Sequence, residues 1–254
     1  MIENKDREDL IEGRNAVIEA LRAERPIDKL YVSGGKTDKA LGRIAAIASE
    51  NGVIVSECDR RKLDAMSVTG AHQGVIAVAA VRNYCDLDDL LALARESGKD
   101  PFFIACDEIE DPHNLGAIIR TAECVGAQGV IIPKRRSAGI TAVVDKASAG
   151  AAEYLPVARV PNMSAAIREL KQAGIWVYGT DAGGNSDCWH TDLTGPVCLV
   201  IGSEGFGLSR LVKETCDAIV GIPMYGHITS LNASAAASVM MYEVLRQRTL
   251  KQEG

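Results

Sequence analysis

The stretch LVIGSEGFGLSRLVKETCDAIVGIPMYGHITSLNAS, residues Leu199–Ser234, decides the fold. The apolar run Val197–Ile201 predicts a buried strand that ends in the glycine-containing loop Gly202–Gly207. A second apolar run, Ala218–Ile222, predicts a strand that ends in Pro223–Thr229. Ligands bind at the carboxyl ends of strands in open α/β sheets, and glycines there let the backbone approach a ligand closely. This stretch therefore predicts a ligand site on an α/β sheet.

Length and composition narrow the class of protein. A chain of 254 residues with 47% hydrophobic residues suits one large or two modest globular domains. No apolar run approaches the roughly 20 residues of a membrane span, and the polar start is unlike a secretory signal, so we expect a cytoplasmic protein with no membrane partner. Seven cysteines without a C-x-x-C pair favour reduced thiols. The net charge of -6 disfavours general polyanion binding but leaves local basic patches open.

Residues 1–82 predict a small alternating α/β unit of about 80 residues, long enough to fold alone. Its expected helices are Glu12–Glu24, capped by Asn15, Thr37–Glu50 and Arg60–Met66, and its expected strands are Asp28–Ser33, Val53–Ser56 and Val75–Ala80. Residues 83–98 are predicted as a linker and a first helix, because Arg82–Asp86 interrupts the pattern before Leu87–Ser97 resumes it.

Residues 99–254 predict a longer alternation of strands and helices. Strands separated by helices indicate a parallel sheet with both faces covered. The expected strands are Pro101–Cys106, Gly129–Ile132, Leu155–Val160, Ile175–Thr180, Val197–Ile201 and Ala218–Ile222, and the expected helices are Pro112–Val125, Ile140–Ala149, Met163–Ala173, Leu208–Thr215 and Asn232–Thr249.

The helix after the strand Pro101–Cys106 has features that helix formation alone does not explain. Asp111 is a good N-cap, with Pro112 at the first helical position. Gly116 in a helix interior costs about 1 kcal/mol against alanine, which suggests that another segment packs close to it. Arg120 lies one turn beyond Gly116 in an otherwise apolar stretch, so we expect it to be buried beside a carboxylate or a ligand phosphate.

The two loops of the opening stretch allow more than one interpretation. The loop GSEGFG fits neither the G-x-G-x-x-G pattern nor the Walker pattern, which disfavours a dinucleotide or phosphate-loop enzyme. Glu204 is either an exposed loop charge or an acceptor for a ligand hydroxyl. Ser230 or Asn232 would serve as the cap of the last helix. No catalytic triad, paired-acid arrangement or metal-ligand cluster emerges, so no metal is expected; the histidines are His72, His113, His190 and His227.

Three motifs together resemble a known family. These are N-x-G-A-x-x-R-T-A at Asn114–Ala122, L-V-I-G-S-E-G-F-G-L-S at Leu199–Ser209, and I-P-M…S-L-N-A-S-A-A within Ile222–Ala236. In this order they resemble the SpoU/TrmH family of RNA ribose 2′-O-methyltransferases. The segment G-R-N-A-V-x-E-A-L, Gly13–Leu21, looks like the ribosomal-protein-L30e-like substrate-binding domain of the bacterial members that methylate a guanosine of 23S rRNA.

The resemblance implies a fold, a cofactor and a set of site residues. It implies a deep trefoil knot in the carboxyl-terminal domain, where the alternation of elements alone predicts an unknotted sheet. It also implies S-adenosylmethionine as the cofactor and a homodimer whose active site is completed across the interface. By this likeness the cofactor contacts are Thr180, Gly202, Ile222 and Leu231, and the catalytic residues are Asn114, Arg120, Glu204, Ser230 and Asn232.

The implied reaction places a ribose 2′-hydroxyl in line with the sulfonium methyl and removes its proton. Arg120 either activates that hydroxyl or orients it, because a guanidinium is essentially always protonated. Lys134–Arg136 is a candidate phosphate contact or a solvated loop. The expected partner is 23S rRNA or its assembly intermediate. Two alternatives are the same chemistry on tRNA and an RNA-binding protein that has lost catalysis.

Overall fold

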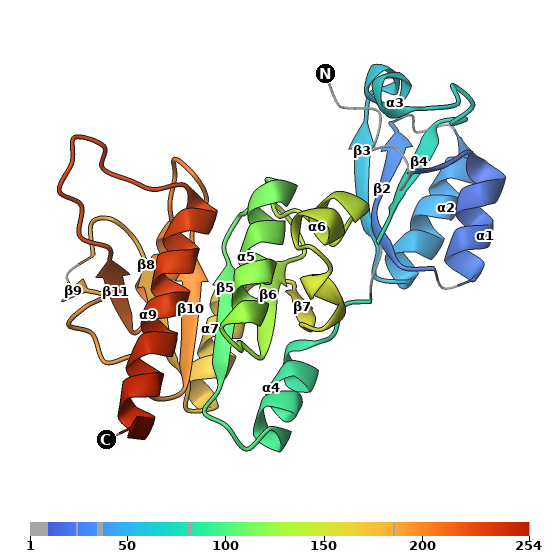
Figure 1. Ribbon diagram of the computed structural model, residues 1–254. Helices are drawn as coiled ribbons and strands as arrows, with labels where there is room; N and C mark the ends of the chain where they lie inside the picture. The colour runs from blue at the N-terminus through green and yellow to red at the C-terminus, as the bar shows by residue number, and fades with distance from the viewer. Residues whose placement is uncertain (1–9, 24, 35–37, 81–82, 185, 254) are drawn as a thin grey trace. The chain divides into compact units, whose positions relative to one another are not determined.

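The computed structural model describes residues 10–23, 25–34, 38–80, 83–184 and 186–253. The chain divides into two compact units, unit 1 with Met1–Asn83 and Gly139–Val143, and unit 2 with Tyr84–Ala138 and Val144–Gly254 (Figure 1). None of the helices in the described ranges combines the length and apolar composition that a membrane crossing demands.

Unit 1 is built on a four-stranded sheet of order β1-β4-β2-β3. Strands β2 and β3 are parallel, whereas β4 runs antiparallel to both β1 and β2. Helices α1 and α2 pack with β2 and β4 in one apolar core that includes Val17, Leu30 and Ile44. The elements are β1 (Leu10–Glu12), α1 (Arg14–Arg22), β2 (Ile27–Ser33), α2 (Lys39–Glu50), β3 (Ile54–Cys58), α3 (Arg60–Met66) and β4 (Val75–Ala79).

The start of unit 1 differs from the sequence prediction. Glu12, predicted to begin a helix, ends strand β1, and its carboxylate accepts hydrogen bonds from Ser67 Oγ at 2.5 Å and Val68 N at 2.6 Å. Gly13, with a φ of 90°, is the N-cap of α1, so Asn15 lies inside the helix instead of capping it. A left-handed φ suits glycine and makes the sharp entry to α1 possible. The predicted helix end at Glu24, helix start at Thr37 and linker start at Arg82 lie outside the described residues.

Unit 2 is built on a seven-stranded sheet of order β7-β6-β5-β10-β8-β11-β9 in which every pair is parallel, as the sequence predicts. Strand β10 lies between β5 and β8, with Leu199 opposite Ile104 and Tyr178. The elements are α4 (Leu87–Glu96), β5 (Phe102–Cys106), α5 (Pro112–Cys124), β6 (Gly129–Pro133), α6 (Ala142–Ala147), the 3-10 helix Ala151–Glu153, β7 (Val157–Val160), α7 (Met163–Gln172), β8 (Trp176–Thr180), β9 (Ser186–Asp187), β10 (Val197–Ile201), α8 (Arg210–Thr215), β11 (Ala218–Gly221) and α9 (Ala233–Glu253).

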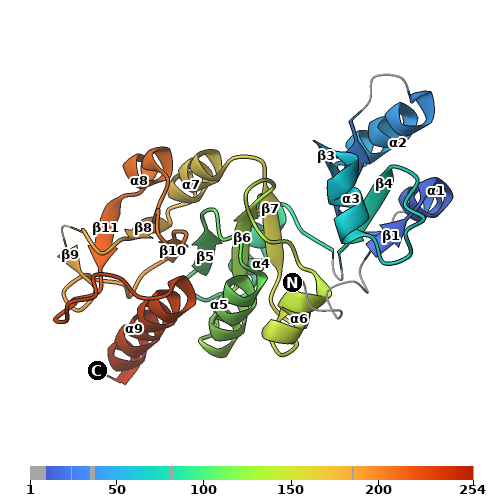
Figure 2. The ribbon, with the colours of Figure 1, turned by 90° about the horizontal axis from the view of Figure 1, so that it is seen from above.

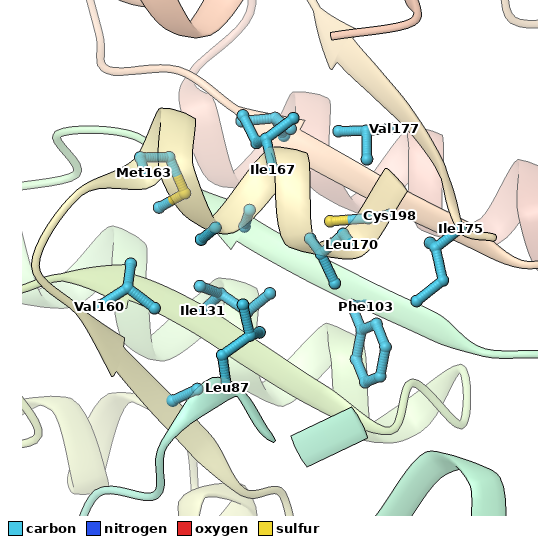
Figure 3. Packing of buried hydrophobic residues seen from close by; sticks show 14 of the residues in the cluster. Leu87, Phe103, Ile131, Val160, Met163, Ile167, Leu170, Ile175, Val177 and Cys198 are labelled. Carbon is cyan, nitrogen blue, oxygen red and sulfur yellow. The ribbon is translucent and has the colours of Figure 1, made fainter. Parts of the chain in front are cut away.

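Helices cover both faces of this sheet. Helices α5 and α9 lie on one face, and α7 and α8 lie on the other (Figure 2). The core on the second face joins Leu87 of α4 and Ile167 of α7 with Phe103 of β5 and Cys198 of β10 (Figure 3). Leu90 of α4 and Val212 of α8 belong to the same core. Because both faces are buried, the central strands are apolar at every position, which explains why their sequences read as continuous apolar runs.

Candidate active site

The carboxyl ends of β8, β10 and β11 open into a cavity of about 490 Å³. It lies where the opening stretch predicts a ligand site, and its volume falls in the usual range for small-molecule pockets. Seven of the nine residues that the resemblance names line it: Thr180, Gly202, Glu204, Ile222, Ser230, Leu231 and Asn232. The other two, Asn114 and Arg120, lie on helix α5.

The glycine loop after β10 is folded back on itself. Ser203 and Gly207 exchange two backbone hydrogen bonds, of 3.1 and 2.9 Å, and Gly205 and Gly207 have φ values of 86° and 67°. A Cβ on Gly202 would lie 2.3 Å from the carbonyl carbon of Gly207. Glycine is therefore required at position 202 by the loop's own backbone, in addition to any close approach of a ligand.

Glu204 is held by two asparagines from distant parts of the chain. Its Oε1 accepts a hydrogen bond from Asn114 Nδ2 at 3.1 Å, another from Asn232 Nδ2, and a longer one from the backbone N–H of Ala233 at 3.4 Å. Asn232 Nδ2 also donates to Asn114 Oδ1 at 3.0 Å. The second carboxylate oxygen of Glu204, Oε2, accepts no hydrogen bond from any described residue. One oxygen of this carboxylate is therefore left for a ligand.

Asn232 is also the N-cap of α9. Its Oδ1 accepts hydrogen bonds from Ser234 N at 3.0 Å and Ala235 N at 3.2 Å, which are orphan donors of the first turn. One side chain therefore caps α9, which confirms the capping prediction, and also contacts Glu204 at the cavity. Ser230, the other predicted cap, lies two residues before it on the exposed cavity rim.

Helix α5 positions Asn114. Asp111 caps the helix by accepting from His113 N at 2.9 Å, with Pro112 in its first turn, as predicted. The close packing expected at Gly116 is confirmed, because a Cβ there would lie 2.4 Å from the Cβ of Ala147 and 2.9 Å from the carbonyl of Val144. Asn114 is buried, so its amide is fixed beside Glu204.

The environment of Arg120 differs from the buried one that the sequence predicts. Its side chain is exposed, it does not line the cavity, and it donates no hydrogen bond to, and forms no ion pair with, any described residue. The prediction of a buried, partnered arginine is wrong for the single chain, because α5 buries its Leu115, Ile118 and Ile119 and leaves position 120 facing outward. The chain alone does not bring Arg120 to the other site residues.

Two aspartates near the cavity were not singled out from the sequence. Burial raises the pKa of Asp107, although its Oδ2 accepts a hydrogen bond from Ser209 N at 2.8 Å. This bond joins the end of β5 to the N-cap residue of α8. Asp181 lines the cavity, and its hydrogen bond from Gly183 N together with Lys213 Nζ at 2.9 Å lowers its pKa. Both aspartates directly follow a predicted strand, and this position is the sequence feature that points to them as candidate site residues.

The basic segment Lys134–Arg136 lies on the loop after β6. Arg136 Nη1 forms an ion pair with Glu108 Oε1 at 3.0 Å, so one of its three charges is engaged, whereas Arg135 is exposed. Among the described residues no group of three histidine, cysteine or acidic side chains is arranged to hold a metal ion. His72 is buried, with Nε2 2.9 Å from Asp64, and has a structural role in unit 1.

A fully parallel α/β sheet with a glycine-looped cavity at the carboxyl ends of its strands places the protein in the class of α/β proteins that bind a small ligand there. Sequence comparison identifies which of these it is. Residues 101–242 match the SpoU rRNA Methylase family, and residues 10–85 match the model described as RNA 2′-O ribose methyltransferase substrate binding. The chain belongs to the SpoU rRNA methylase family.

Individual relatives agree with this family. A Bacillus subtilis protein, YacO, which carries the name of a TrmH family tRNA/rRNA methyltransferase, is 50% identical over 94% of this chain and 96% of its own. An AdoMet-bound rRNA methyltransferase from Sinorhizobium meliloti has a TM-score of 0.60 and 28% identity over 96% of this chain and 88% of its own. A TrmH/SpoU tRNA modifying enzyme from A. aeolicus has a TM-score of 0.56 and 29% identity over 65% of this chain and 86% of its own.

Proposed function

We propose that this protein transfers a methyl group from S-adenosylmethionine to a ribose 2′-hydroxyl of RNA. The observation that carries the proposal is the cavity at the ends of β8, β10 and β11, where Glu204, Asn114 and Asn232 converge in a chain of the SpoU rRNA methylase family. The match of residues 10–85 to a ribose 2′-O-methyltransferase substrate-binding model supports the ribose as the acceptor.

The cavity fits the cofactor. It is flanked by glycine-rich backbone at Gly202–Gly207 and by the strand ends at Thr180 and Ile222, which suit an adenosine-containing ligand bound largely through main-chain groups. We propose Thr180, Gly202, Ile222 and Leu231 as its contacts. When bound, S-adenosylmethionine supplies an electrophilic sulfonium methyl.

The polar cluster orients the acceptor. Glu204 Oε1 is occupied by its two asparagine partners, so the free Oε2 is available to accept a hydrogen bond from a ribose hydroxyl. Ser230 and Asn232 sit on the same cavity wall. Holding the reacting groups in line supplies most of the rate enhancement that such a transfer needs, because the alkyl donor is already activated.

We propose that Arg120 acts in a homodimer, in the active site of the partner chain. Its exposure and its absence from the residues that line the cavity support this arrangement. Exposed apolar side chains on the same unit, Tyr225, Ile228 and Tyr242, offer surface for such an association. At the interface Arg120 would orient or activate the hydroxyl that loses its proton.

The proposed substrate is a guanosine of 23S rRNA, free or in an assembly intermediate. The rRNA methyltransferase from Sinorhizobium meliloti aligns with 96% of this chain, whereas the tRNA modifying enzyme from A. aeolicus aligns with 65%. We propose residues 1–82 as an L30e-like RNA-binding domain, residues 83–98 as linker and first helix, and residues 99–254 as the methyltransferase domain. The mixed sheet of unit 1 with helices α1 and α2 supports the first of these.

We further propose that the methyltransferase domain is tied in a deep trefoil knot. The strand order supports it, since β10 enters between β5 and β8 and the chain then returns past β11 to α9, which contacts α5. An experimentally determined chain path through Leu199–Met240, closed between the termini, tests the knot.

Transfer of radiolabelled methyl groups tests the function. The acceptor is 23S rRNA from a strain that lacks this gene, and the product is digested to nucleosides. We expect label in 2′-O-methylguanosine, and its loss in Arg120→Ala with unchanged affinity for adenosylhomocysteine. Glu169→Gln, an exposed carboxylate on α7, is the control. If neither adenosylmethionine nor adenosylhomocysteine binds, the result would favour the alternative of a catalytically silent RNA-binding protein. If label appears in tRNA alone, the substrate would be tRNA and not 23S rRNA.

A further inference from the structure

A second cavity, of about 320 Å³, adjoins the first. The two share Ser203, Glu204 and Phe206, and the second is completed by Asn114 and the segment Glu108–Asp111 after β5. If the proposed function holds, the ribose of the target nucleotide lies beside the cofactor, near Glu204. The base attached to that ribose must then occupy neighbouring space, and the second cavity is the neighbour that shares the Glu204 wall.

Phe206 marks this cavity as a place for a planar ligand. Its side chain is 94% exposed at the tip of the glycine loop, although an aromatic ring in water forgoes the burial that normally places it in a core. A base taken out of its stack is commonly held against an aromatic side chain, and every base offers a flat face for this. Phe206 is therefore suited to stack on the base of a nucleotide whose ribose faces Glu204.

The carboxylates of the cavity decide which base fits. Glu108 is paired with Arg136, Asp111 caps α5, and Glu204 binds the two asparagines. Glu110 is exposed, and no described residue gives it a hydrogen bond or an ion pair. So many carboxylates repel a phosphate, and among the described residues they do not form a metal-ligand group. Glu110 is therefore open to a ligand that carries hydrogen-bond donors, such as the edge of a base.

The segment that carries Glu110 is held in place. Ile109 is buried, its carbonyl accepts from Ala138 N at 2.8 Å, and the Glu108–Arg136 ion pair ties the same two loops together. Glu108 and Arg136 have φ values of 57° and 55°, a conformation that non-glycine residues adopt only where their surroundings impose it. Glu110 is therefore presented from a fixed backbone, as a recognition group requires.

We infer, on the basis of the proposed function, that this second cavity reads guanine, with Phe206 stacking on the base and Glu110 accepting hydrogen bonds from its Watson–Crick edge. Guanine places two donors, N1–H and the N2 amino group, side by side, which matches the two oxygens of one carboxylate. Adenine and cytosine each place an acceptor beside their amino group, and uracil flanks its single donor with two acceptors. A carboxylate therefore favours guanine over the other three bases.

The test uses the full chain and 23S rRNA from a strain that lacks this gene, with labelled methyl groups counted in all four 2′-O-methylnucleosides. Once the modified position is mapped, transcripts carrying guanosine, inosine or adenosine there are compared. Inosine lacks the N2 amino group. We expect wild type to prefer guanosine over inosine by about 10–100-fold in kcat/KM, and Glu110→Gln to lose most of that preference. Phe206→Leu is expected to raise KM, and Phe206→Tyr to restore it.

Controls separate this inference from the proposed function. Glu169→Gln keeps both rate and preference, and each variant is checked for adenosylhomocysteine affinity, because Phe206 lines both cavities. Two results would overturn the recognition of guanine without contradicting the proposed methyltransferase function. One is label from wild type in a nucleoside other than 2′-O-methylguanosine, and the other is an unchanged guanosine preference in Glu110→Gln. No methyl transfer to any RNA by wild type overturns both.

Discussion

At the scale of single residues, Asn232 makes two kinds of contact with one amide group, a helix cap and a bond to a residue of the cavity. Its Oδ1 caps α9, and its amide N–H groups bind Glu204 and Asn114. The residue type at this position predicts a helix cap, and the family resemblance implies a place in the active site, so the sequence offers the two roles as alternatives. They are compatible because the amide group has an acceptor end and a donor end, and these point to different partners.

Substitutions at Asn232 separate the two roles. Asn232→Ala should lower the free energy of unfolding by about 1 kcal/mol through loss of the cap and should also impair methyl transfer. Asn232→Ser keeps a capping oxygen but has no amide to hold Glu204, so it should restore stability without restoring activity. Urea unfolding and the labelled-methyl assay measure the two effects. Equal activity of the serine variant and wild type would show that the Glu204 contact is dispensable.

Asp107 should give the protein a distinctive pH dependence. Burial raises its pKa above the ordinary value of 3.8, so its contribution to stability is complete below that value and is lost as pH rises through the folded pKa. Asp107→Asn removes the titration while keeping an oxygen for Ser209 N. The stability of Asp107→Asn relative to wild type should therefore increase as the pH rises above 3.8 and through the folded pKa. Urea unfolding across this range measures it, with Glu169→Gln expected to follow wild type.

At the scale of elements, the helices and strands of unit 2 were largely predictable because each central strand is an unbroken apolar run. The short strands β1 and β9, of three and two residues, were missed because no periodicity can be read over so few positions. Helix α6 is also shorter than predicted, Ala142–Ala147 instead of Ile140–Ala149. Its small residues give little helical pattern from which to locate the ends.

Gly116 tests the contact between α5 and α6. Gly116→Ala places a methyl group 2.4 Å from the Cβ of Ala147, and the overpacking should cost about 1–3 kcal/mol. Both tryptophans, Trp176 and Trp189, lie in unit 2, so their fluorescence reports its unfolding. Gly42→Ala in α2 is the matched control, because its Cβ would meet nothing within 4 Å. Gly42→Ala should raise the free energy of unfolding of unit 1 by up to about 1 kcal/mol, which circular dichroism would measure. A neutral Gly116→Ala would mean that α6 moves away freely.

At the scale of the whole molecule, the sequence predicts a set of candidate site residues but not the exposed position of Arg120. The motifs follow one another along the chain, and six of the seven named residues that line the cavity belong to them, the exception being Thr180. The buried positions Leu115, Ile118 and Ile119 leave Arg120 on the outer side of α5, and its proposed use in the active site requires a second chain. Hydrophobic periodicity predicts neither the order of strands in a sheet nor an association between chains.

Mixing two inactive variants tests whether the site is shared between chains. Arg120→Ala and Glu204→Ala should each be inactive alone. Co-expressed at equal levels, half of the dimers contain one chain of each kind, and one of their two sites has both residues intact. About a quarter of wild-type activity should return. No recovery in a verified mixed dimer would place Arg120 and Glu204 in the same chain.

The position of β10 has a consequence for how the protein is made. This strand separates β5 from β8, yet it leaves the ribosome after both of them. Until residues 197–201 emerge, β5 and β8 each expose an unpaired edge, and such edges are sites of misassociation. The nascent chain therefore reaches its most aggregation-prone stage late, when the last fifth of the sequence is still being translated, and protection by a chaperone matters most in that interval.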